Sequence, residues 1–416
     1  MKVYKFGGAS VKDAASVINV SKIVLETPEE PLIIVASAMG KMTNALEELV
    51  AAVFEKRSLE VEAKYRVVET FHLNLLSEIY PELYNVSSAV QHLLKELKNA
   101  IKVDYPDYGR AYDSIVPFGE LLSTTVISEY LNTQNRASTW LDTRQLVVTN
   151  SHHRRATVNW EVTEKRIREA IRGDQVYLVQ GFIGADSQGH TTTLGREGSD
   201  YTASVFAFCT DAEDVTIWKD VPAVLNGDPK VFPNCIPLKT ISYREAIELA
   251  YYGASVIHPK TIQPLQRKEI PLRVCSFIDR SAPGTLITRG AGLDPLVPCF
   301  IQKTKQVLIT LSTHDLAFIV EDHLSFIYQA FHDLGVSVNL MQNTAISSSF
   351  CINHDAIMFP KLLKTLEKSF DVRFNDNLTI YTIRHYNPLV INGLKEGKEV
   401  LVEQISRNTF QMVCKA

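Results

Sequence analysis

A lysine followed closely by two glycines lies near the start of the chain, in the run Lys5-Phe6-Gly7-Gly8-Ala9-Ser10. Glycines let the backbone approach a ligand closely, and a helix that begins after them offers free N–H groups and positive potential. Lys5 adds a full charge at the same point, so the segment predicts an anion cradle, most simply for phosphates. A plain structural turn explains it equally well when it is taken alone. It is not a Walker A loop, which needs a longer glycine spacing.

Four further segments place charged or hydroxyl side chains at the predicted start of a helix or the end of a strand. They contain Thr43 (in 37–44), Glu120 (in 117–120), Arg196, Ser199 and Asp200 (in 193–201), and Asp220 and Lys230 (in 218–230). Taken singly, these residues are explained as well by helix capping or by compensation of the helix dipole. An arginine flanked by glycines also suits bidentate recognition of a carboxylate. In this order after the Lys5 segment, they predict a site of phosphoryl transfer.

The elements that would position these residues alternate between strand and helix over residues 1–280. Apolar, β-branched runs predict strands at 2–6, 32–36, 176–182, 215–218 and 272–277. Helical patterns lie at 11–25, with Ser10 as the expected N-cap, and at 43–54, 118–132, 200–209 and 242–252. The stretch 58–102 lacks strand signals and predicts a helical insertion. This alternation predicts an α/β fold with a mainly parallel central sheet sandwiched by helices, whose ligands bind at the carboxyl ends of the strands.

The order and length of the predicted strands and helices change after a segment rich in proline and glycine, at about 280–298. Beyond it, a strand–helix–strand–strand–helix order over 307–370, closed by a strand at 378–384, predicts a ferredoxin-like α+β unit. A second unit begins at about 378 and is too short to repeat the first in full. We therefore predict a first domain at 1–285 and a second region at 299–416, the latter divided into units at about 304–377 and 378–416.

Bulk properties exclude several classes of protein. A length of 416 residues suggests two or three domains, and a net charge of −4 gives no reason to expect a nucleic-acid partner. The basic run 152–155 is most simply a solvated loop. No apolar stretch reaches the about 18–20 residues that a membrane span needs, and no signal-peptide pattern precedes the first strand. Six scattered cysteines indicate neither a metal site nor a disulfide framework, so we expect a cytoplasmic protein.

The first 280 residues resemble the aspartokinases of the amino-acid-kinase superfamily. The resemblance runs through the segments KFGGAS, SAMGKMTN, PFGE, LGREGSDYTA, WKDV, NGDPKV and GASVIHPKTI. The remainder resembles the paired ACT regulatory units that follow the catalytic domain in that family. The resemblance implies transfer of the ATP γ-phosphoryl to the side-chain carboxylate of L-aspartate, which gives 4-phospho-L-aspartate. This reaction opens lysine, threonine and methionine synthesis.

The resemblance also implies roles for individual residues. Lys5 and Asp200 would be catalytic, and Thr43, Glu120, Arg196 and Ser199 would hold aspartate. A carboxylate nucleophile with a pKa near about 3.9 is already ionised, so Lys5 would neutralise charge rather than assist a general base. The implied ATP contacts are Lys5, Gly7, Gly8, Ser10, Lys219, Asp220, Leu225, Lys230 and Ser255. Mg²⁺ would be carried mainly by ATP, so no protein metal ligands are assigned.

Several positions depart from the family pattern. Ser255 stands where many relatives have a lysine, and Leu225 where many have an aromatic residue. Lys219 replaces a small hydroxyl residue, and Glu197 a small or neutral one. These departures bear on ATP affinity and pocket detail more than on the reaction class.

In the C-terminal region, the resemblance implies amino-acid binding by residues 336–347. The candidate effector-binding residues are Val338, Asn339, Asn343, Thr344 and Ala345, with lysine or threonine as the effector and a homodimer or larger assembly. The alternative is that the C-terminal region binds no effector and only forms a dimer interface. For the whole chain, the alternatives are a kinase of another small amino acid or carbamate, and a non-catalytic, amino-acid-sensing ACT protein.

Overall fold

The computed structural model describes residues 1–27, 31–80, 87–134, 136–173, 175–254, 257–315 and 317–415. The chain forms two compact units. The first comprises Met1–Val224, Pro237–Ile247 and Ile257–Leu293, and the second comprises Leu225–Ile236, Glu248–Val256 and Asp294–Ala416. The chain thus passes between the units more than once, and the predicted bounds of 1–285 and 299–416 stay a prediction.

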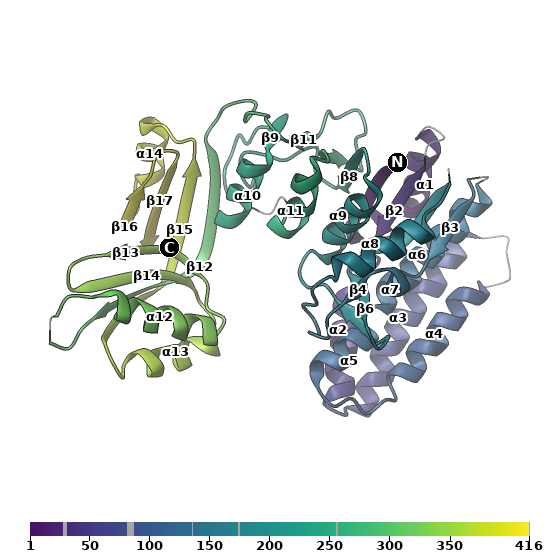
Figure 1. The fold of residues 1–416 in the computed structure, drawn as a ribbon, viewed down its shortest axis with the longest axis horizontal. Helices are drawn as coiled ribbons and strands as arrows, with labels where there is room; N and C mark the ends of the chain where they lie inside the picture. The colour runs from purple at the N-terminus through teal and green to yellow at the C-terminus, as the bar shows by residue number, and fades with distance from the viewer. Residues whose placement is uncertain are drawn as a thin grey trace. The chain divides into compact units, whose positions relative to one another are not determined.

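The first unit is organised by an eight-stranded sheet in the order β3-β5-β2-β1-β8-β10-β11-β9 (Figure 1). Neighbouring strands are parallel except for the antiparallel pair β10 and β11. Every residue of β2 and β5 is buried, because the continuous apolar runs of a parallel sheet are covered on both faces. The strands are β1 (Lys2–Phe6), β2 (Leu32–Ala36), β3 (Ser138–Leu141), β5 (Val176–Gln180), β8 (Asp214–Lys219), β9 (Thr240–Ser242), β10 (Leu272–Ser276) and β11 (Thr285–Thr288). The predicted α/β fold with a mainly parallel sheet is confirmed.

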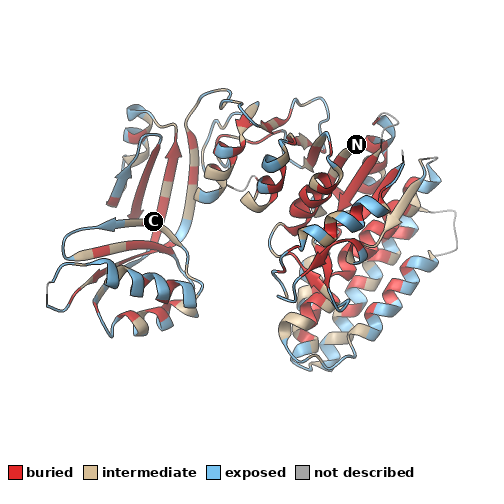
Figure 2. Ribbon diagram, viewed as in Figure 1, coloured by how far each residue is buried: buried red, intermediate tan, exposed pale blue. Residues whose placement is uncertain are grey.

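Helices cover both faces of this sheet. Phe6, Ile34 and Ala36 pack in one core with apolar residues of α1, α2 and α6, and alternate residues of β2 face the opposite layer, which contains α9. Figure 2 shows that buried residues run along the strands of this unit, whereas its helices carry both buried and exposed residues. The helices of this unit are α1 (Ala14–Glu26), α2 (Met42–Phe54), α3 (Ser58–Ile79), α4 (Ser88–Ala100), α5 (Tyr108–Ile115), α6 (Phe118–Thr133), α7 (Thr143–Leu146), α8 (Trp160–Ala170), α9 (Gly198–Thr210) and α11 (Pro259–Lys268). Helix α10 (Tyr243–Tyr252) begins in this unit and ends in the second. Helices α3 and α4 form the predicted insertion. Among the described residues, no helix is both long and apolar enough to cross a membrane.

Several short elements were not predicted. Strands β3, β9 and β11 extend the main sheet, and β4 (Val148–Thr149), β6 (Ile183–Asp186) and β7 (Thr191–Thr193) form a small second sheet. These strands are two to four residues long, too short for an alternating pattern to emerge. The segment rich in proline and glycine at about 280–298 therefore contains β11.

The predicted helix cap Ser10 was wrong, and Thr43, for which capping was the alternative explanation, is not a cap either. Ser10 lies inside a 3₁₀ turn, Gly8–Val11, so α1 begins later, and its N-cap is Asp13, whose carboxylate accepts the N–H of Ser16 at 2.8 Å. At the start of α2, the cap position belongs to Lys41, and Thr43 is the second helical residue. Both hydroxyl residues are thereby freed from capping, and both line the pocket described below.

The second unit carries a six-stranded antiparallel sheet in the order β13-β14-β12-β15-β17-β16. Its strands are β12 (Cys299–Ser312), β13 (Val338–Asn343), β14 (Ser347–Asn353), β15 (Asp371–Arg384), β16 (Val400–Ile405) and β17 (Thr409–Lys415), and its helices are α12 (Glu321–Asp333), α13 (Met358–Leu366) and α14 (Pro388–Lys395). The predicted strand–helix–strand–strand–helix order is confirmed by β12, α12, β13, β14 and α13.

Two long strands connect the halves of this sheet. The second half of β12 pairs with the first half of β15, whereas residues 299–303 pair with 380–384, alongside β17 and β16. Lys305 and Asn377, where the pairing is irregular, adopt the left-handed conformation with φ of 54° and 51°. The shortened second half is therefore completed by a strand that precedes the first half in the chain.

Candidate active site

The carboxyl ends of four parallel strands lie level with one another. Phe6 of β1 pairs in register with Ala36 of β2 and with Trp218 of β8, and Ala36 pairs with Gln180 of β5. The loops that follow these strands line a pocket of about 930 Å³, together with the N-termini of α6 and α9. This is where an open parallel sheet places its ligands.

Most of the predicted site residues line this one pocket. They are Lys5, Gly7, Gly8, Ser10, Thr43, Glu120, Arg196, Ser199, Asp200, Lys219 and Asp220. Leu225 and Lys230 belong to the second unit, and Ser255 lies outside the described residues. The nucleotide contacts assigned to these three residues stay predictions.

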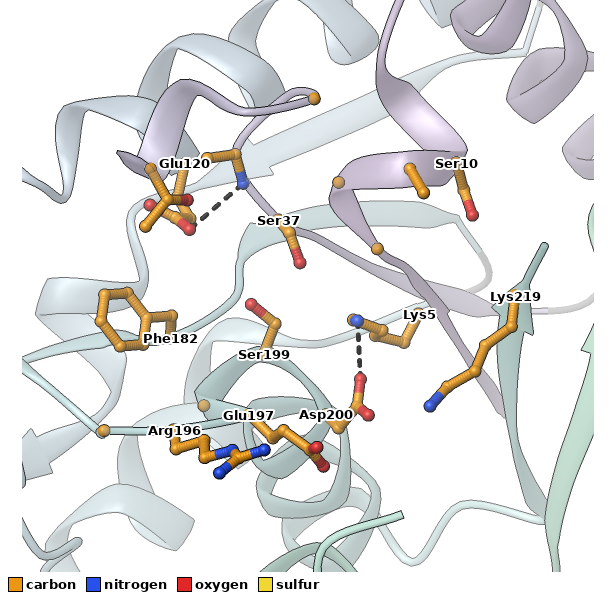
Figure 3. A pocket seen from close by; sticks show the side chains of 18 of the residues that line it. Lys5, Ser10, Ser37, Glu120, Phe182, Arg196, Glu197, Ser199, Asp200 and Lys219 are labelled. Carbon is orange, nitrogen blue, oxygen red and sulfur yellow. Dashed lines mark hydrogen bonds and ion pairs between the residues drawn. The ribbon is translucent and has the colours of Figure 1, made fainter. Parts of the chain in front are cut away.

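Lys5 and Asp200 form a buried ion pair at the centre of the pocket. The Nζ atom of Lys5 lies 2.6 Å from Oδ1 of Asp200, and the two residues are 8% and 4% exposed (Figure 3). Asp200 is the third residue of α9 rather than its cap, which is Glu197 in a left-handed conformation with φ of 53°. A Cβ atom on Gly7 would lie 3.2 Å from the Lys5 ammonium. The glycine therefore leaves that charge open to a ligand.

Glu120 offers a carboxylate oxygen that has no partner. Its Oε1 atom accepts the N–H of Ala38 at 3.1 Å, but Oε2 is buried without a hydrogen bond among the described residues. Burial raises the pKa of this carboxyl group to about 8, against the opposing effects of the Ala38 N–H and the Lys5 charge. A buried acceptor without a donor is costly, so this oxygen is suited to a cationic ligand group such as an ammonium.

The two glycine-bearing loops at the pocket hold each other in place. The N–H of Gly40 donates to the carbonyl of Gly8 at 3.0 Å, and a Cβ atom on Gly8 would come within 2.8 Å of the Ala38 carbonyl oxygen. Only glycine permits this approach, since a backbone atom cannot move aside as a flexible side chain does. The loop after β1 and the loop after β2 therefore form one rigid wall.

The charged groups divide between two sides of Lys5. Figure 3 shows Glu120, Phe182 and Arg196 on one side of Lys5 and Ser10 and Lys219 on the other. Arg196 is exposed and forms no ion pair among the described residues. The first side combines an unpartnered carboxylate oxygen with a guanidinium, a combination that suits an amino acid. The second side combines the glycine turn with a lysine, which suits phosphates.

Sequence reasoning missed part of the wall. Tyr112, His153, Arg154, Arg155 and Phe182 also line the pocket. Arg154 and Arg155 are exposed, as expected for a solvated loop at 152–155, but this loop also lines the pocket. Its basic composition was the only available signal, and it was not informative because this loop follows β4 of the small sheet, which had not been predicted.

Gly181 makes the contact between the end of β5 and the start of α9, and this suggests a direct test. A Cβ atom there would lie 2.4 Å from both Cβ and Oγ of Ser199. We expect Gly181→Ala to lower the free energy of unfolding by about 1–3 kcal/mol and to displace Ser199 in the pocket. Denaturant titration would measure this loss. Gly292→Ala, whose added methyl group would meet nothing within 4 Å, is the matched control.

A second pocket, of about 680 Å³, lies within the second unit. Two predicted effector residues, Val338 and Asn339, line it together with Tyr251, Tyr252 and residues of α12, β16 and β17. Asn343 ends β13, and Thr344 and Ala345 form the turn to β14; none of the three lines this pocket. The effector roles of all five residues stay predictions.

Comparison with known proteins agrees with this geometry. The profile of the amino acid kinase family matches residues 1–276. The chain is 30% identical over 413 residues to aspartokinase 3 of Arabidopsis thaliana, covering 97% of this chain and 73% of that protein. It is 31% identical over 386 residues to the bifunctional aspartokinase/homoserine dehydrogenase of Daucus carota, covering 88% of this chain but 42% of that protein. The chain therefore spans less than half of one of these relatives and about three quarters of the other.

Solved structures show the same likeness. A crystal structure of E. coli aspartokinase III with aspartate and ADP matches with a TM-score of 0.84 and 25% identity, covering 100% of this chain and 96% of that chain. The same protein with lysine and aspartate matches with a TM-score of 0.79 and 26% identity, covering 99% and 95%. The glycine-loop pocket at the strand ends, the family profile and these full-length likenesses agree: this chain belongs to the amino acid kinase family and, within it, to the aspartokinases.

Proposed function

We propose that this protein transfers the γ-phosphoryl group of ATP to the side-chain carboxylate of L-aspartate, giving 4-phospho-L-aspartate and ADP. The observation that carries the proposal is a single pocket that contains both a buried lysine, Lys5, and an unpartnered, buried carboxylate oxygen of Glu120. The lysine suits a phosphoryl group in transfer, and the oxygen suits the ammonium of an amino acid. The aspartate and ADP named for the E. coli relative are consistent with the same pair of ligands.

For this reaction the protein needs to position the two substrates and to stabilise the negative charge on the transferred group. The aspartate side chain, with a pKa near about 3.9, is ionised at neutral pH and attacks the γ-phosphorus directly as the bond to the ADP oxygen breaks. Lys5 stabilises the negative charge on the phosphoryl oxygens, and Asp200 holds the Lys5 ammonium in place. Glu120 binds the ammonium of aspartate, Arg196 binds its α-carboxylate, and Thr43 and Ser199 complete the aspartate half.

The nucleotide half uses the opposite side of Lys5. Gly7, Gly8 and Ser10 approach the phosphates, and Lys219 and Asp220 lie on the same wall at the end of β8. Leu225, Lys230 and Ser255 are further proposed contacts. Mg²⁺ enters as part of the ATP complex, coordinated largely by ATP oxygens and water, and serves as part of the substrate.

The formation of an acyl phosphate is the decisive test. ATP, Mg²⁺ and aspartate are incubated with hydroxylamine, which traps 4-phospho-L-aspartate as a hydroxamate that gives a coloured complex when iron(III) is added. We expect the product with L-aspartate and far less with glutamate, acetylglutamate or carbamate. Equal or greater turnover of another acceptor would favour the alternative of a different small-molecule kinase. No product from folded protein with any acceptor would favour a non-catalytic sensor.

We also propose that the second unit is regulatory and that lysine or threonine is its effector. The support is its sheet, whose strand and helix order resembles ACT units, and the lysine named in the E. coli complex. We expect millimolar L-lysine or L-threonine to lower the rate of the hydroxamate assay, with D-lysine as the control. A rate that is unchanged by both effectors would leave the unit with a purely structural role. A homodimer, a cytoplasmic location and a place in lysine, threonine and methionine synthesis belong to the same proposal.

A further inference from the structure

A non-glycine residue in the left-handed conformation lies at the pocket. Arg154 has a φ of 66° and lines the pocket together with Glu120 and Arg196. Left-handed backbone is uncommon for residues with a side chain and persists where the surrounding contacts enforce it.

Asp113, a fully buried residue of α5, holds the loop. Its two carboxylate oxygens accept the backbone N–H of Arg154 at 3.2 and 3.1 Å, and Oδ2 accepts Nδ1–H of His153 at 2.8 Å. Oδ1 also accepts the hydroxyl of Thr193 at 2.7 Å. One buried carboxylate thus ties the Arg154 loop to the end of β7, two residues before the turn that presents Arg196.

The Arg154 loop also packs directly against that turn. A Cβ atom on Gly195 would lie 3.2 Å from the carbonyl oxygen of Arg154, and the N–H of Ala156 donates to the carbonyl of Thr193 at 2.9 Å. Gly195 is itself left-handed, with φ of 79°. The backbone positions of Arg154 and Arg196 are therefore fixed relative to each other.

The guanidinium of Arg154 is held by stacking. Its Cζ atom lies 4.9 Å from the ring centroid of Tyr112 and 5.3 Å from that of Tyr108, and the Tyr112 hydroxyl donates to Glu47 at 2.8 Å. Stacking on a ring face leaves the N–H groups on the edge of a guanidinium available. Among the described residues, Arg154 forms no ion pair, so these donors are not committed to a carboxylate of the protein.

We propose that Arg154 is a specificity-determining residue whose guanidinium, with that of Arg196, binds the α-carboxylate of the amino-acid substrate. This inference rests on the proposed function. Asp113 is a positioning residue that acts through the loop. Two guanidinium groups that line the same pocket as Glu120 would select for an acceptor with an α-carboxylate beside its ammonium, because each contributes charge-assisted hydrogen bonds. An acceptor with a neutral group in that place would gain nothing from Arg154.

The test compares L-aspartate with its α-amide, which keeps the ammonium and the side-chain carboxylate but lacks the α-carboxylate charge. Arg154→Gly is the informative variant, since glycine adopts the left-handed conformation without strain. We expect it to raise the KM for aspartate about 10- to 100-fold, with kcat and the KM for ATP little changed. The inhibition constant of the α-amide should stay the same. Arg172→Gln, an exposed cation outside the pocket, is the charge-matched control.

Two results would overturn the inference: an unchanged KM for aspartate in Arg154→Gly, or an equal weakening of aspartate and its α-amide. The second result would mean that the loop only shapes the pocket. Arg154→Lys keeps the positive charge but lacks the planar guanidinium, which can donate two parallel hydrogen bonds to a carboxylate. It should give a KM for aspartate between those of the wild type and Arg154→Gly. Calorimetric binding of aspartate and the α-amide needs no turnover. It therefore tests Arg154 even if no hydroxamate forms, a failure that would instead count against the proposed function.

Discussion

Lys5→Met is expected to lower kcat of the hydroxamate assay by about 1,000-fold, because in the proposed reaction the variant lacks the positive charge that would face the transferred phosphoryl group. Lys5 is buried beside the glycine turn, where its electrostatic effect is stronger than in water. The KM values for ATP and aspartate should change much less than kcat, since the charge develops in transfer. Steady-state kinetics with each substrate varied in turn would measure the difference.

The same substitution leaves the Asp200 carboxylate buried without its cation. Loss of one partner of a buried ion pair costs about 3–5 kcal/mol, so the single variant should also be less stable. The double variant Lys5→Met/Asp200→Asn removes both charges and should recover stability but not kcat. Asp200→Asn alone keeps the ammonium and should retain more activity than Lys5→Met. Near-normal kcat in folded Lys5→Met would refute the role given to this lysine.

Glu120→Gln is expected to raise the KM for aspartate about 100-fold, because the substrate ammonium would lose its anionic partner in a buried place. Glutamine can still accept the N–H of Ala38, so the helix and loop should remain as they are. The KM for ATP should change little, since Figure 3 shows Glu120 on the side of Lys5 away from Lys219. Initial rates over a wide aspartate range would give both constants.

The pH dependence of the same variant is a second test. With a pKa raised to about 8 by burial, Glu120 is mainly protonated at neutral pH in the free protein, and binding of an ammonium requires it to lose that proton. The KM for aspartate should therefore fall as the pH rises toward about 8, and this fall should be absent in Glu120→Gln. Calorimetry in buffers of different ionisation enthalpy should detect release of a proton on aspartate binding, and only in the wild type.

The free energy of unfolding should change with pH in the opposite direction: aspartate binding strengthens as the pH rises, whereas the contribution of Glu120 to stability weakens. The folded-state pKa of Glu120 lies above its usual value of 4.5, so the folded chain binds more protons than the unfolded chain between that value and about 8. This contribution to stability is fully present below pH 4.5 and is lost as the pH rises through about 8. Glu120→Gln lacks this contribution. In thermal unfolding, the stability of the variant relative to the wild type should therefore increase as the pH rises. A constant difference between the two would mean that Glu120 titrates normally.

Local patterns predicted most of the framework. Apolar β-branched runs identified β1, β2, β5, β8 and β10, since continuous apolar strands are characteristic of a buried parallel sheet. The motifs that follow them identified nearly all of the pocket, because parallel strands in register bring the loops after them to the same edge. The missed strands β4 and β7 are only two and three residues long, too short for a pattern of their own. Strand β4 is held by pairing with β6, a distant segment of the chain, and β7 closes a short hairpin with the same strand.

The amino-acid sequence by itself determined the fold class, the family resemblance and the identity of the glycine turn with Lys5 as the centre of the site. Only the tertiary structure decided how these groups are paired: Asp200 faces Lys5, Glu120 keeps one oxygen unpartnered, and Asp113 holds Arg154 left-handed at the wall of the pocket. Helix and strand patterns depend on residues close in sequence. Ion pairs, burial and enforced backbone angles depend on groups from distant segments, which meet only when the sheet has formed.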